Sequence, residues 1–496
     1  MLSEITDQIK AYLPGSDTAL LEKAYNFSLN AHKDQLRASG QAYFTHCEAA
    51  ALILTELKLD IETVSAALLH DVLEDTKISK EEIEKEFGPG IAALVEGVTK
   101  ISSYHFDDQE MAQAENWRKM LLAVTKDIRV ILIKFADRLH NLRTIQHLPE
   151  ERQKKIATET LYLYAPFAQR LGIYRWKSEF EDLSFRILFP EEHKAISSLW
   201  LAQKEKNLVT LEAFKAGLLE KLAEYNMPLR ISARPKSLYG TFKKMRRQHK
   251  EFTEIQDMIA LRLITDSIPN CYGLLGLVHS LYKPVPESFT DYISLPKINM
   301  YQSLHTSIFD EKGNIAEIQI RTEAMHRSAE YGIAAHWRYK EGKAGQSSGG
   351  LPRAEDIEEK LDWLKQVLEW QSDLKDPKEF LNALKSECRF EQVFVFTPKG
   401  KVVKLPGGAT PLDFAYSVHT DIGNHCYGAK IGGKLVPLDY KLKSGLVIEI
   451  LTRKNSNPTK DWLEFVITAR ARSKIRKFLK SEEEKNLRGG ITTKDR

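Results

Sequence analysis

The sequence predicts a chain of several domains, in which an all-helical domain is followed by a mixed α/β domain and a small β-rich domain. Its 496 residues exceed the roughly 250 to 300 at which one hydrophobic core stops growing. Apolar residues recur at helical spacing from Ala19 to about Leu201. From about Leu229 they form short runs with a period of two, which is typical of strands. Similar runs, broken by Gly and Pro turns, return between Glu391 and Thr452.

These changes of pattern divide the chain into five predicted segments. The stretch "KEGKAGQSSGGLPR", residues 340–353, is rich in Gly and Ser and predicts a linker. Residues 453–480 carry nine Lys and Arg against two acids, which makes them the one pronounced basic patch. The expected segments are 1–195 (helical domain with connecting helices), 196–342 (α/β domain), 343–388 (linker and helix), 389–453 (small β-rich domain) and 454–496 (basic helical tail).

The composition excludes several classes of protein. With 43% hydrophobic and 28% charged residues, the chain is neither disordered nor fibrous. Lys and Arg exceed Asp and Glu by only 72 − 68 = 4, so any nucleic-acid binding requires a local patch. The four cysteines form no C-x-x-C pair, which argues against a disulfide framework or structural zinc and predicts a cytoplasmic protein. No run of about 18 apolar residues occurs, so we expect no membrane span, and the acidic N-terminus predicts no export.

The stretch "LLHDVLEDT", residues 68–76, carries unusual charge for an apolar helix. Residues i and i+4 share a helix face, so His70 is expected to align with Glu74, and Asp71 with Asp75. A solvated helix face is the alternative for an isolated His-Asp pair.

Two other helices offer partners for this stretch. His46 begins an apolar helix after a Gly-containing turn that carries Arg37. Asp137 lies in a second apolar helix, "KFADRLHNLRT", with Asn141 one turn later on the same face. Two imidazoles and two carboxylates without a thiolate suit a divalent ion that keeps positions open for water. The pattern therefore favours a catalytic metal over a structural one.

The α/β segment contains a candidate phosphate site. "SARPKSLYGTFKKM" gathers Arg234, Lys236 and Lys244 around a helix expected to begin at Ser237, whose backbone N–H groups favour an anion. Three cations and a helix start suit a polyphosphate. A solvated basic helix is the alternative.

Two strand patterns add carboxylates. In "DMIALRLI", Asp257 ends an otherwise apolar row. In "AEIQIRT", Glu317 heads a polar stripe while Ile318 and Ile320 fill the core. Carboxylates at strand ends beside a phosphate-binding helix suggest Mg²⁺ binding and phosphoryl or pyrophosphoryl transfer.

Between these strands lies "DYISLPKINMYQSLHT", a turn-rich segment with Lys297, Tyr301, Gln302 and His305. A tyrosine flanked by polar groups can stack on a base, although a packed core aromatic is the commoner reading of such a residue.

The helical segment resembles the HD phosphohydrolase superfamily, and "HDVLEDT" with "ADRLHNLRT" is similar more narrowly to the hydrolase domain of the RelA/SpoT alarmone enzymes, over residues 19–190. The resemblance implies Mn²⁺ held by four ligands, with Glu74 and Asp75 acting on the water that attacks the 3′-pyrophosphate of (p)ppGpp. It also implies that Arg37 contacts phosphate and that Asn141 and Thr144 line the nucleotide pocket. The implied Mn²⁺ ligands are His46, His70, Asp71 and Asp137. Ala38 replaces the Lys that many relatives have after this Arg, so one phosphate contact is expected to be weaker.

Residues 200–342 are similar to the synthetase domain of the same family, a nucleotidyltransferase-like α/β domain, and "EIQIRTEAMHRSAEYGIAAHWRYKEG" is the most specific string. The resemblance implies pyrophosphate transfer from ATP to the 3′-hydroxyl of GDP or GTP. Asp257 would hold Mg²⁺ and Glu317 would deprotonate the hydroxyl. Tyr301 would stack on guanine. The implied ATP-phosphate ligands are Arg234, Lys236 and Lys244, and Lys297 and His305 are expected near the acceptor phosphates.

One motif departs from the family. Bifunctional members carry a basic R-x-K-D and synthetase-only members an acidic E-x-D-D, whereas this chain reads "SFTD", Ser288 to Asp291. The departure leaves open the GDP versus GTP preference, the Mg²⁺ dependence and the rate of synthesis. We still expect synthesis, because Asp257, Glu317 and Tyr301 are all present.

The segment "VFVFTPKGKVVKLPGG" to "LVIEILT" resembles a TGS domain, a small β-grasp module. The resemblance implies contact of His419 with the 3′ end of uncharged tRNA and a role at the ribosome, whereas composition alone favours an ordinary turn histidine. The basic segment "ARARSKIRKFLK" is expected either to add phosphate contacts or to be a solvated helix face. Relatives commonly continue into zinc-finger-like and ACT domains, which this sequence lacks.

Three functional hypotheses follow. The first is a bifunctional enzyme of the stringent response that makes and degrades (p)ppGpp at two separate sites. The second is a hydrolase-only regulator that binds tRNA or the ribosome and whose synthetase is impaired by "SFTD". The third is a generic HD phosphodiesterase fused to a nucleotidyltransferase-like sensor. For the first, we expect opposed control of the two sites through the helices at about 150–200.

Overall fold

The structure is a computed structural model that describes residues 2–99, 117, 121–225, 227–233, 236–255, 259–297, 299–309, 313–335 and 392–491. These residues fall into two units, each considered by itself. The first unit contains residues 2–99 and 126–335, and the second contains Trp117 with residues 121–125 and 392–491. Within these ranges, every helix is too short or too polar to cross a membrane. The predicted linker and helix at 343–388 lie outside the described residues.

The first half of the first unit is entirely helical, as the periodicity predicted. Helices α3 and α8 pack against each other, and both are apolar over most of their surface because they lie in the centre of this half. Asp60 begins α4 by accepting a hydrogen bond from the Thr63 backbone N–H. The elements are α1 (Leu2–Tyr12), α2 (Ala19–Ala31), α3 (Phe44–Thr55), α4 (Ile61–Leu68), α5 (Val72–Asp75), α6 (Lys80–Thr99), α8 (Arg129–Arg143), η1 (Ile145–His147), α9 (Glu150–Glu159), η2 (Thr160–Tyr164), α10 (Ala165–Arg170) and α11 (Tyr174–Leu188).

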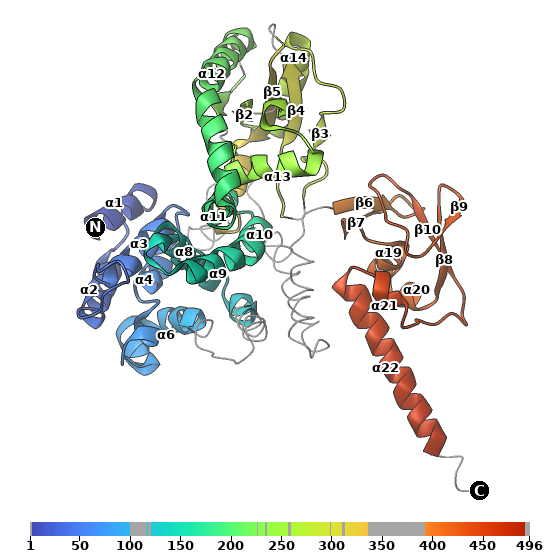
Figure 1. The fold of residues 1–496 in the computed structure, drawn as a ribbon, viewed down its shortest axis with the longest axis horizontal. Helices are drawn as coiled ribbons and strands as arrows, with labels where there is room; N and C mark the ends of the chain where they lie inside the picture. The colour runs from blue at the N-terminus through green and yellow to red at the C-terminus, as the bar shows by residue number, and fades with distance from the viewer. Residues whose placement is uncertain are drawn as a thin grey trace. The chain divides into compact units, whose positions relative to one another are not determined.

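A single long helix, α12 (Pro190–Ala223), leads into the second half of the unit. Pro190 stands at its first position, where the missing N–H costs nothing. The predicted boundary between residues 195 and 196 falls inside this helix and stays a prediction. Leu211, Phe214 and Leu218 join the core beneath the sheet, and Figure 1 shows α12 running alongside the strands.

The second half is a five-stranded mixed sheet with helices, which confirms the predicted α/β domain. The strand order is β1-β2-β5-β4-β3, and only the β2–β5 pair is parallel. Ile318 and Ile320 are fully buried in the core, as predicted. The strands are β1 (Arg230–Ala233), β2 (Ile259–Thr265), β3 (Thr290–Asp291), β4 (Leu304–Phe309) and β5 (Ile315–Thr322). The helices are α13 (Leu238–Gln248), η3 (Phe252–Glu254), α14 (Ile268–Leu281) and α15 (Glu323–Tyr331).

The two halves meet at a close backbone junction. The Ile333 N–H donates to the Leu171 carbonyl at 2.9 Å. Gly332 lies against Gly172 so tightly that a Cβ on Gly332 would overlap with the Leu171 carbonyl oxygen. Asn299 Nδ2 donates to the Gln169 carbonyl at 2.9 Å. This junction fixes the end of α10 against the segments that follow α15 and precede β4.

The second unit contains the small β-rich domain and a C-terminal helix. Strands β6 (Gln392–Phe396) and β7 (Val402–Pro406) form a hairpin, and β8 (Cys426–Ile431), β9 (Lys434–Val436) and β10 (Ile448–Thr452) form an antiparallel sheet in the order β10-β8-β9. Helix α19 (Pro411–Val418) begins with a capping box between Thr410 and Asp413. The remaining helices are α20 (Thr420–Asn424), α21 (Trp462–Phe465) and α22 (Ala469–Ile491).

Candidate metal centre and candidate nucleotide site

Four predicted metal-binding side chains converge in the helical half. His46 Nε2 on α3 lies 3.3 Å from Asp137 Oδ1 on α8 and 3.5 Å from Asp71 Oδ2. His70 Nε2 lies 3.1 Å from Asp71 Oδ1. All four residues are buried or nearly so. The tertiary structure therefore brings together residues that are up to 91 positions apart in the sequence, because 137 − 46 = 91.

The local structure of the His-Asp pair differs from the prediction. We expected one helix through residues 68–76, but α4 ends at Leu68 and α5 begins at Val72, so His70 and Asp71 lie in the intervening turn. The expected i to i+4 stripe from His70 to Glu74 is therefore wrong. The turn instead directs both side chains toward His46.

A hydrogen bond fixes the orientation of the His70 ring in the cluster. Its Nδ1 lies 2.7 Å from the Ala67 carbonyl and donates a proton to it, so Nε2 is the nitrogen that can bind a metal ion once it has lost its proton. Nε2 is buried, and it lies 3.1 Å from Asp71 Oδ1 without the geometry of a hydrogen bond. Burial opposes protonation of His70, but the Asp71 and Asp137 carboxylates raise its pKa to about 9. A divalent cation at this position would replace the proton on Nε2 and neutralise the carboxylates that surround it.

The donor set fits a divalent metal ion. One ligand atom each from His46, His70 and Asp137 lies within 4.8 Å of the other two, and Asp71 contacts both histidines. The electrostatic field of this cluster also favours anionic carboxylates. Burial alone would raise the pKa of both carboxylates. His70 and His46 nevertheless hold the pKa of Asp71 below its usual range. Lys134 and His46 do the same for the pKa of Asp137.

A second layer of residues supports these side chains. Arg37 Nη2 donates to Asn141 Oδ1 at 3.0 Å, and Asn141 Nδ2 donates to Asp137 Oδ1 at 2.5 Å. Lys134 Nζ pairs with Asp137 Oδ2 at 2.8 Å. Burial lowers the pKa of Lys134, but Asp137 more than offsets this and raises it above the usual range. Arg37 and Asn141 therefore act on the cluster as well as on the pocket.

His140, which the sequence reading did not single out, contacts His46. The two Nδ1 atoms are 2.7 Å apart, and Arg37 Nη1 lies 3.4 Å from the same His140 atom. Burial, followed by His46 and Arg37, lowers the pKa of His140 to about 3. His140 is consequently neutral and can accept the proton on His46 Nδ1.

Tyr43 is another residue that the sequence reading missed. Its hydroxyl lies 2.9 Å from Asp71 Oδ2 and 2.6 Å from Asp75 Oδ2. The single phenolic proton can be donated to only one of the two at a time. Burial and the two carboxylates raise the pKa of Tyr43 far above its ordinary value. Tyr43 thus connects Asp71, a predicted metal ligand, to Asp75, a carboxylate predicted to act on the attacking water.

A pocket of about 450 Å³ opens onto the cluster. Glu74 and Asp75 are exposed and line it together with Arg37, Asn141 and Thr144, so the structure brings the predicted hydrolase residues to one cavity. Arg152 from α9, a further lining residue, was not predicted. The pocket combines carboxylates near the histidines with several cations, which suits an anionic substrate.

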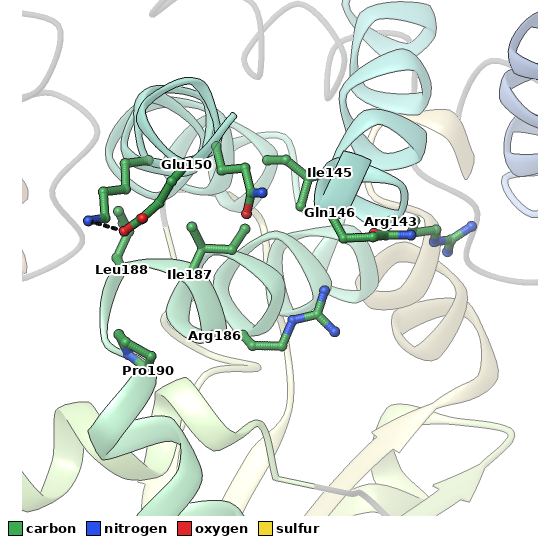
Figure 2. Close-up of a pocket in the computed structure, with 10 residues that line it drawn as sticks. Arg143, Ile145, Gln146, Glu150, Arg186, Ile187, Leu188 and Pro190 are labelled. Carbon is green, nitrogen blue, oxygen red and sulfur yellow. Dashed lines mark ion pairs between the residues drawn. The ribbon is translucent and has the colours of Figure 1, made fainter. Parts of the chain in front are cut away.

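A separate and larger pocket, of about 650 Å³, is drawn in Figure 2. Its walls come from the end of α8, from η1 and α9, and from the α11–α12 corner at Arg186 to Pro190. Two of its cations are paired with carboxylates: Lys154 with Glu150 at 2.6 Å, and Arg143 with Glu179 at 2.6 Å. None of the predicted site residues lines it, so volume alone does not identify the reactive site.

In the α/β half, Glu317 sits on the central strand β5 between Ala260 of β2 and Ser307 of β4. Gln319 Nε2 donates to Glu317 Oε1 at 2.8 Å, and His305 Nδ1 lies 3.6 Å from the same oxygen. The polar stripe predicted for β5 exists, but Gln319 and Arg321 are each only 1% exposed. Of the three polar residues on this face, Glu317 is the most accessible.

Tyr301 joins this group through His305. The Tyr301 hydroxyl lies 2.9 Å from His305 Nε2, and the ring makes an edge contact with Tyr174, with centroids 5.5 Å apart. Lys297 Nζ lies 4.3 Å from the Tyr292 ring centroid and 5.1 Å from that of Tyr301. The structure therefore places Lys297, Tyr301, His305 and Glu317 in one polar and aromatic cluster.

Helix α13 begins where the sequence predicted. Ser237 caps it by accepting from the Gly240 N–H. Asp182 of α11 accepts from the Tyr239 N–H at 2.9 Å, so two of the N–H groups expected to favour an external anion already have protein partners. Lys236 and Lys244 are half-buried. Arg234 and Asp257 lie outside the described residues.

The "SFTD" motif is integrated into the fold. Asp291 accepts from the backbone N–H groups of Ile293 and Ser294 and from the Tyr272 hydroxyl. Ser288 Oγ accepts from the Ser307 N–H. These two residues thus shape the segment that leads to Lys297.

In the second unit, His419 caps α20 by accepting from the Asp421 N–H. Its side chain is 64% exposed. The predicted tRNA-contacting residue is therefore accessible and also has a local structural role.

Comparison with known families matches three regions of the chain. The HD domain model matches residues 24–174, the model described as "Region found in RelA / SpoT proteins" matches residues 233–344, and the TGS domain model matches residues 393–452. The fold is therefore an all-α HD domain, an α/β synthetase-type domain and a β-grasp TGS domain, as the sequence resemblance implied.

Curated relatives cover nearly the whole chain. It is 49% identical over 492 residues to a GTP pyrophosphokinase from Myxococcus xanthus, covering 98% of this chain and 64% of the relative. It is 48% identical over 475 residues to a probable guanosine-3′,5′-bis(diphosphate) 3′-pyrophosphohydrolase from Synechocystis, covering 95% and 62%. It is 43% identical over 481 residues to the bifunctional (p)ppGpp synthase/hydrolase SpoT of Escherichia coli K12, covering 97% and 68%. The chain belongs to the RelA/SpoT family, and it spans less than two thirds of the length of the first two relatives.

Proposed function

We propose that this chain is a bifunctional alarmone enzyme of the stringent response, with one site that hydrolyses (p)ppGpp and another that synthesises it. The observation that carries the proposal is the presence of two chemically different clusters in one unit. One contains two histidines and two carboxylates around a common centre. The other contains Glu317 beside His305 and Tyr301.

For hydrolysis, His46, His70, Asp71 and Asp137 would hold Mn²⁺. When bound, the ion supplies positive charge that favours ionisation of a water molecule and offsets charge on the departing pyrophosphate. Glu74 and Asp75 stand at the pocket wall, where one of them would take the proton of the attacking water. Arg37 would hold a phosphate.

Substrate positioning in this pocket would come from its remaining walls. Asn141 and Thr144 would contact the nucleoside, and Arg152 adds a cation for the phosphates. The products would be GDP or GTP and pyrophosphate. Hydrolase activity named for the Synechocystis relative supports this assignment.

For synthesis, Glu317 would remove the proton of the 3′-hydroxyl of GDP or GTP as that oxygen attacks the β-phosphorus of ATP and AMP leaves. Tyr301 would stack on guanine, and Lys297 and His305 would lie near the acceptor phosphates. Arg234, Lys236 and Lys244 would bind ATP phosphates, and Asp257 would hold Mg²⁺. The name of the Myxococcus relative, a GTP pyrophosphokinase, supports this half.

The TGS domain extends the proposal to partners. Exposed His419 would contact the 3′ end of uncharged tRNA, and the basic residues of α22 would add phosphate contacts at the ribosome. We also propose a cytoplasmic location and the domain limits given above.

The proposal is tested with the purified chain in two reactions. Labelled ATP with GDP or GTP and Mg²⁺ should yield (p)ppGpp, and ppGpp with Mn²⁺ should yield GDP and pyrophosphate. Failure of the first reaction alone leaves the hydrolase-only alternative that "SFTD" suggested. Failure of the second, with Mn²⁺ bound, rules out the hydrolase assignment.

A further inference from the structure

A buried thiol adjoins the candidate metal centre. Cys47 follows His46 on α3 and is fully buried. One ligand atom each from Cys47, His70 and Asp71 lies within 4.8 Å of the other two. Two of these three residues, His70 and Asp71, also belong to the four predicted Mn²⁺ ligands. The thiol therefore lies beside an imidazole and a carboxylate of the candidate metal centre.

The chemistry of the second group differs from that of the first. Sulfur is a soft ligand that selects ions such as Zn²⁺, whereas carboxylate and imidazole donors also accept Mn²⁺. His70 Nε2 is the atom that both groups would need, because Nδ1 donates to the Ala67 carbonyl and Nε2 is buried beside Asp71. A single imidazole lone pair can bind only one ion at a time.

We propose that Cys47, His70 and Asp71 form a second, overlapping metal site that takes a thiolate-binding divalent ion such as Zn²⁺, Cd²⁺ or Co²⁺ and thereby displaces Mn²⁺ from the hydrolase site. The displacement, but not the binding, rests on the proposed hydrolase function. When the ion binds, a metal–sulfur bond forms and the thiol proton is released to solvent. Because the two sites share His70 and Asp71, occupancy by the soft ion stops hydrolysis.

The test uses the metal-free full-length chain titrated with Co²⁺. A cobalt–thiolate bond produces a near-ultraviolet absorption band that nitrogen and oxygen ligands do not give. The wild type should show this band, and Cys47→Ser should lose it. Cys271→Ser and Cys426→Ser are matched controls because both replace buried cysteines in other parts of the fold, and both should keep the band.

A second measurement links the sites. Free Mn²⁺ is followed by its paramagnetic resonance signal, and Cd²⁺ added to the Mn²⁺-loaded wild type should release the bound Mn²⁺. Cys47→Ser should still bind Mn²⁺ with wild-type affinity, which also shows that it is folded, but should need more Cd²⁺ for release. Cys47→Ala repeats the comparison without an oxygen in place of sulfur.

The outcomes separate this inference from the proposed function. Mn²⁺ binding without a cobalt–thiolate band overturns the second site and leaves the hydrolase site standing. A band that persists in Cys47→Ser shows that another cysteine holds the ion and also overturns it. Absence of binding of either ion contradicts both metal assignments.

Discussion

The Nδ1 atoms of His46 and His140 lie 2.7 Å apart, so one imidazole donates a proton to the other. His46 Nε2 faces Asp71 and Asp137, and an Nε2 that binds a metal must leave the proton on Nδ1. His140 is then the acceptor and fixes the tautomer and the orientation of His46. Such outer contacts are typically worth about 10- to 100-fold in metal affinity or activity.

We therefore predict that His140→Leu lowers both Mn²⁺ affinity and the hydrolysis rate by about 10- to 100-fold. His140→Asn is the matched control, because its side-chain oxygen can replace Nδ1 as acceptor, and it should recover most of the affinity. Mn²⁺ binding measured by paramagnetic resonance decides the point. Equal affinities for His140→Leu and the wild type would show that His140 does not position His46.

Removing the Tyr43 hydroxyl tests its connection between Asp71 and Asp75. Tyr43→Phe leaves both carboxylates without that donor while keeping the ring, so we expect the hydrolysis rate constant kcat to fall by about 10-fold or more. The rate of Mg²⁺-dependent synthesis, measured on the same protein, should be unchanged, because Tyr43 lies in the helical half and the proposed synthesis site lies in the α/β half. A Tyr43→Phe protein with full hydrolysis would assign Tyr43 to packing alone.

The junction between the two halves should be intolerant of a side chain at Gly332. Its φ of +58° is unfavourable for L residues, and a Cβ would overlap with Leu171 and Gly172. We expect Gly332→Ala to cost more than about 2 kcal/mol of unfolding free energy. Gly313→Ala is the control, with a φ of +78° but no atom of the described residues within 4 Å of the added Cβ, and strain alone should cost it about 1 kcal/mol. Equal thermal midpoints for the two variants would show that the close contact at Gly332 adds no cost beyond the backbone strain.

The buried carboxyl group of Asp182 should make the free energy of unfolding depend on pH. Burial raises the pKa of Asp182 from 3.8 to about 6, although the Tyr239 N–H partly opposes this. Because the pKa is higher in the folded state, the folded protein holds this proton more tightly than the unfolded chain does. The stabilisation is therefore fully present below about pH 4 and is lost as the pH rises through about 6. Asp182→Asn keeps the acceptor for the Tyr239 N–H and removes the charge.

We accordingly expect Asp182→Asn to stabilise the protein by about 2 kcal/mol at pH 8 and to have little effect near pH 4. Thermal unfolding of both proteins across this pH range provides the measurement. A stabilisation that does not change with pH would assign the effect to packing instead of ionisation.

Local periodicity predicted the helical, α/β and small β-rich regions, whereas the β-grasp fold of the last region was implied by the resemblance to a TGS domain. It also predicted the start of α13, since Ser237 is a favourable N-cap. It did not predict the break after Leu68, because the apolar spacing of α4 continues through Leu69 and Val72 while the chain turns. The spacing of apolar residues shows which face of a helix is buried, but it does not show where the helix ends when it packs against its neighbours.

The candidate metal ligands were predicted through family resemblance, whereas several supporting residues were not. Tyr43 and Asp71 are 28 positions apart, and His46 and His140 are 94 apart, so no local pattern links them. Lys134 could have been predicted from the sequence, because a cation three residues before Asp137 in an apolar helix is a recognisable ion pair. Cys47 was not predicted as a ligand, because two imidazoles and two carboxylates already form a complete ligand set without a thiolate.

The central claim is that one chain carries two separate reactions. The most direct measurement is synthesis and hydrolysis of (p)ppGpp on matched preparations of the wild type, His70→Ala and Glu317→Gln. We predict that His70→Ala loses hydrolysis and keeps synthesis, and that Glu317→Gln loses synthesis and keeps hydrolysis. Loss of both reactions from either folded variant would contradict it.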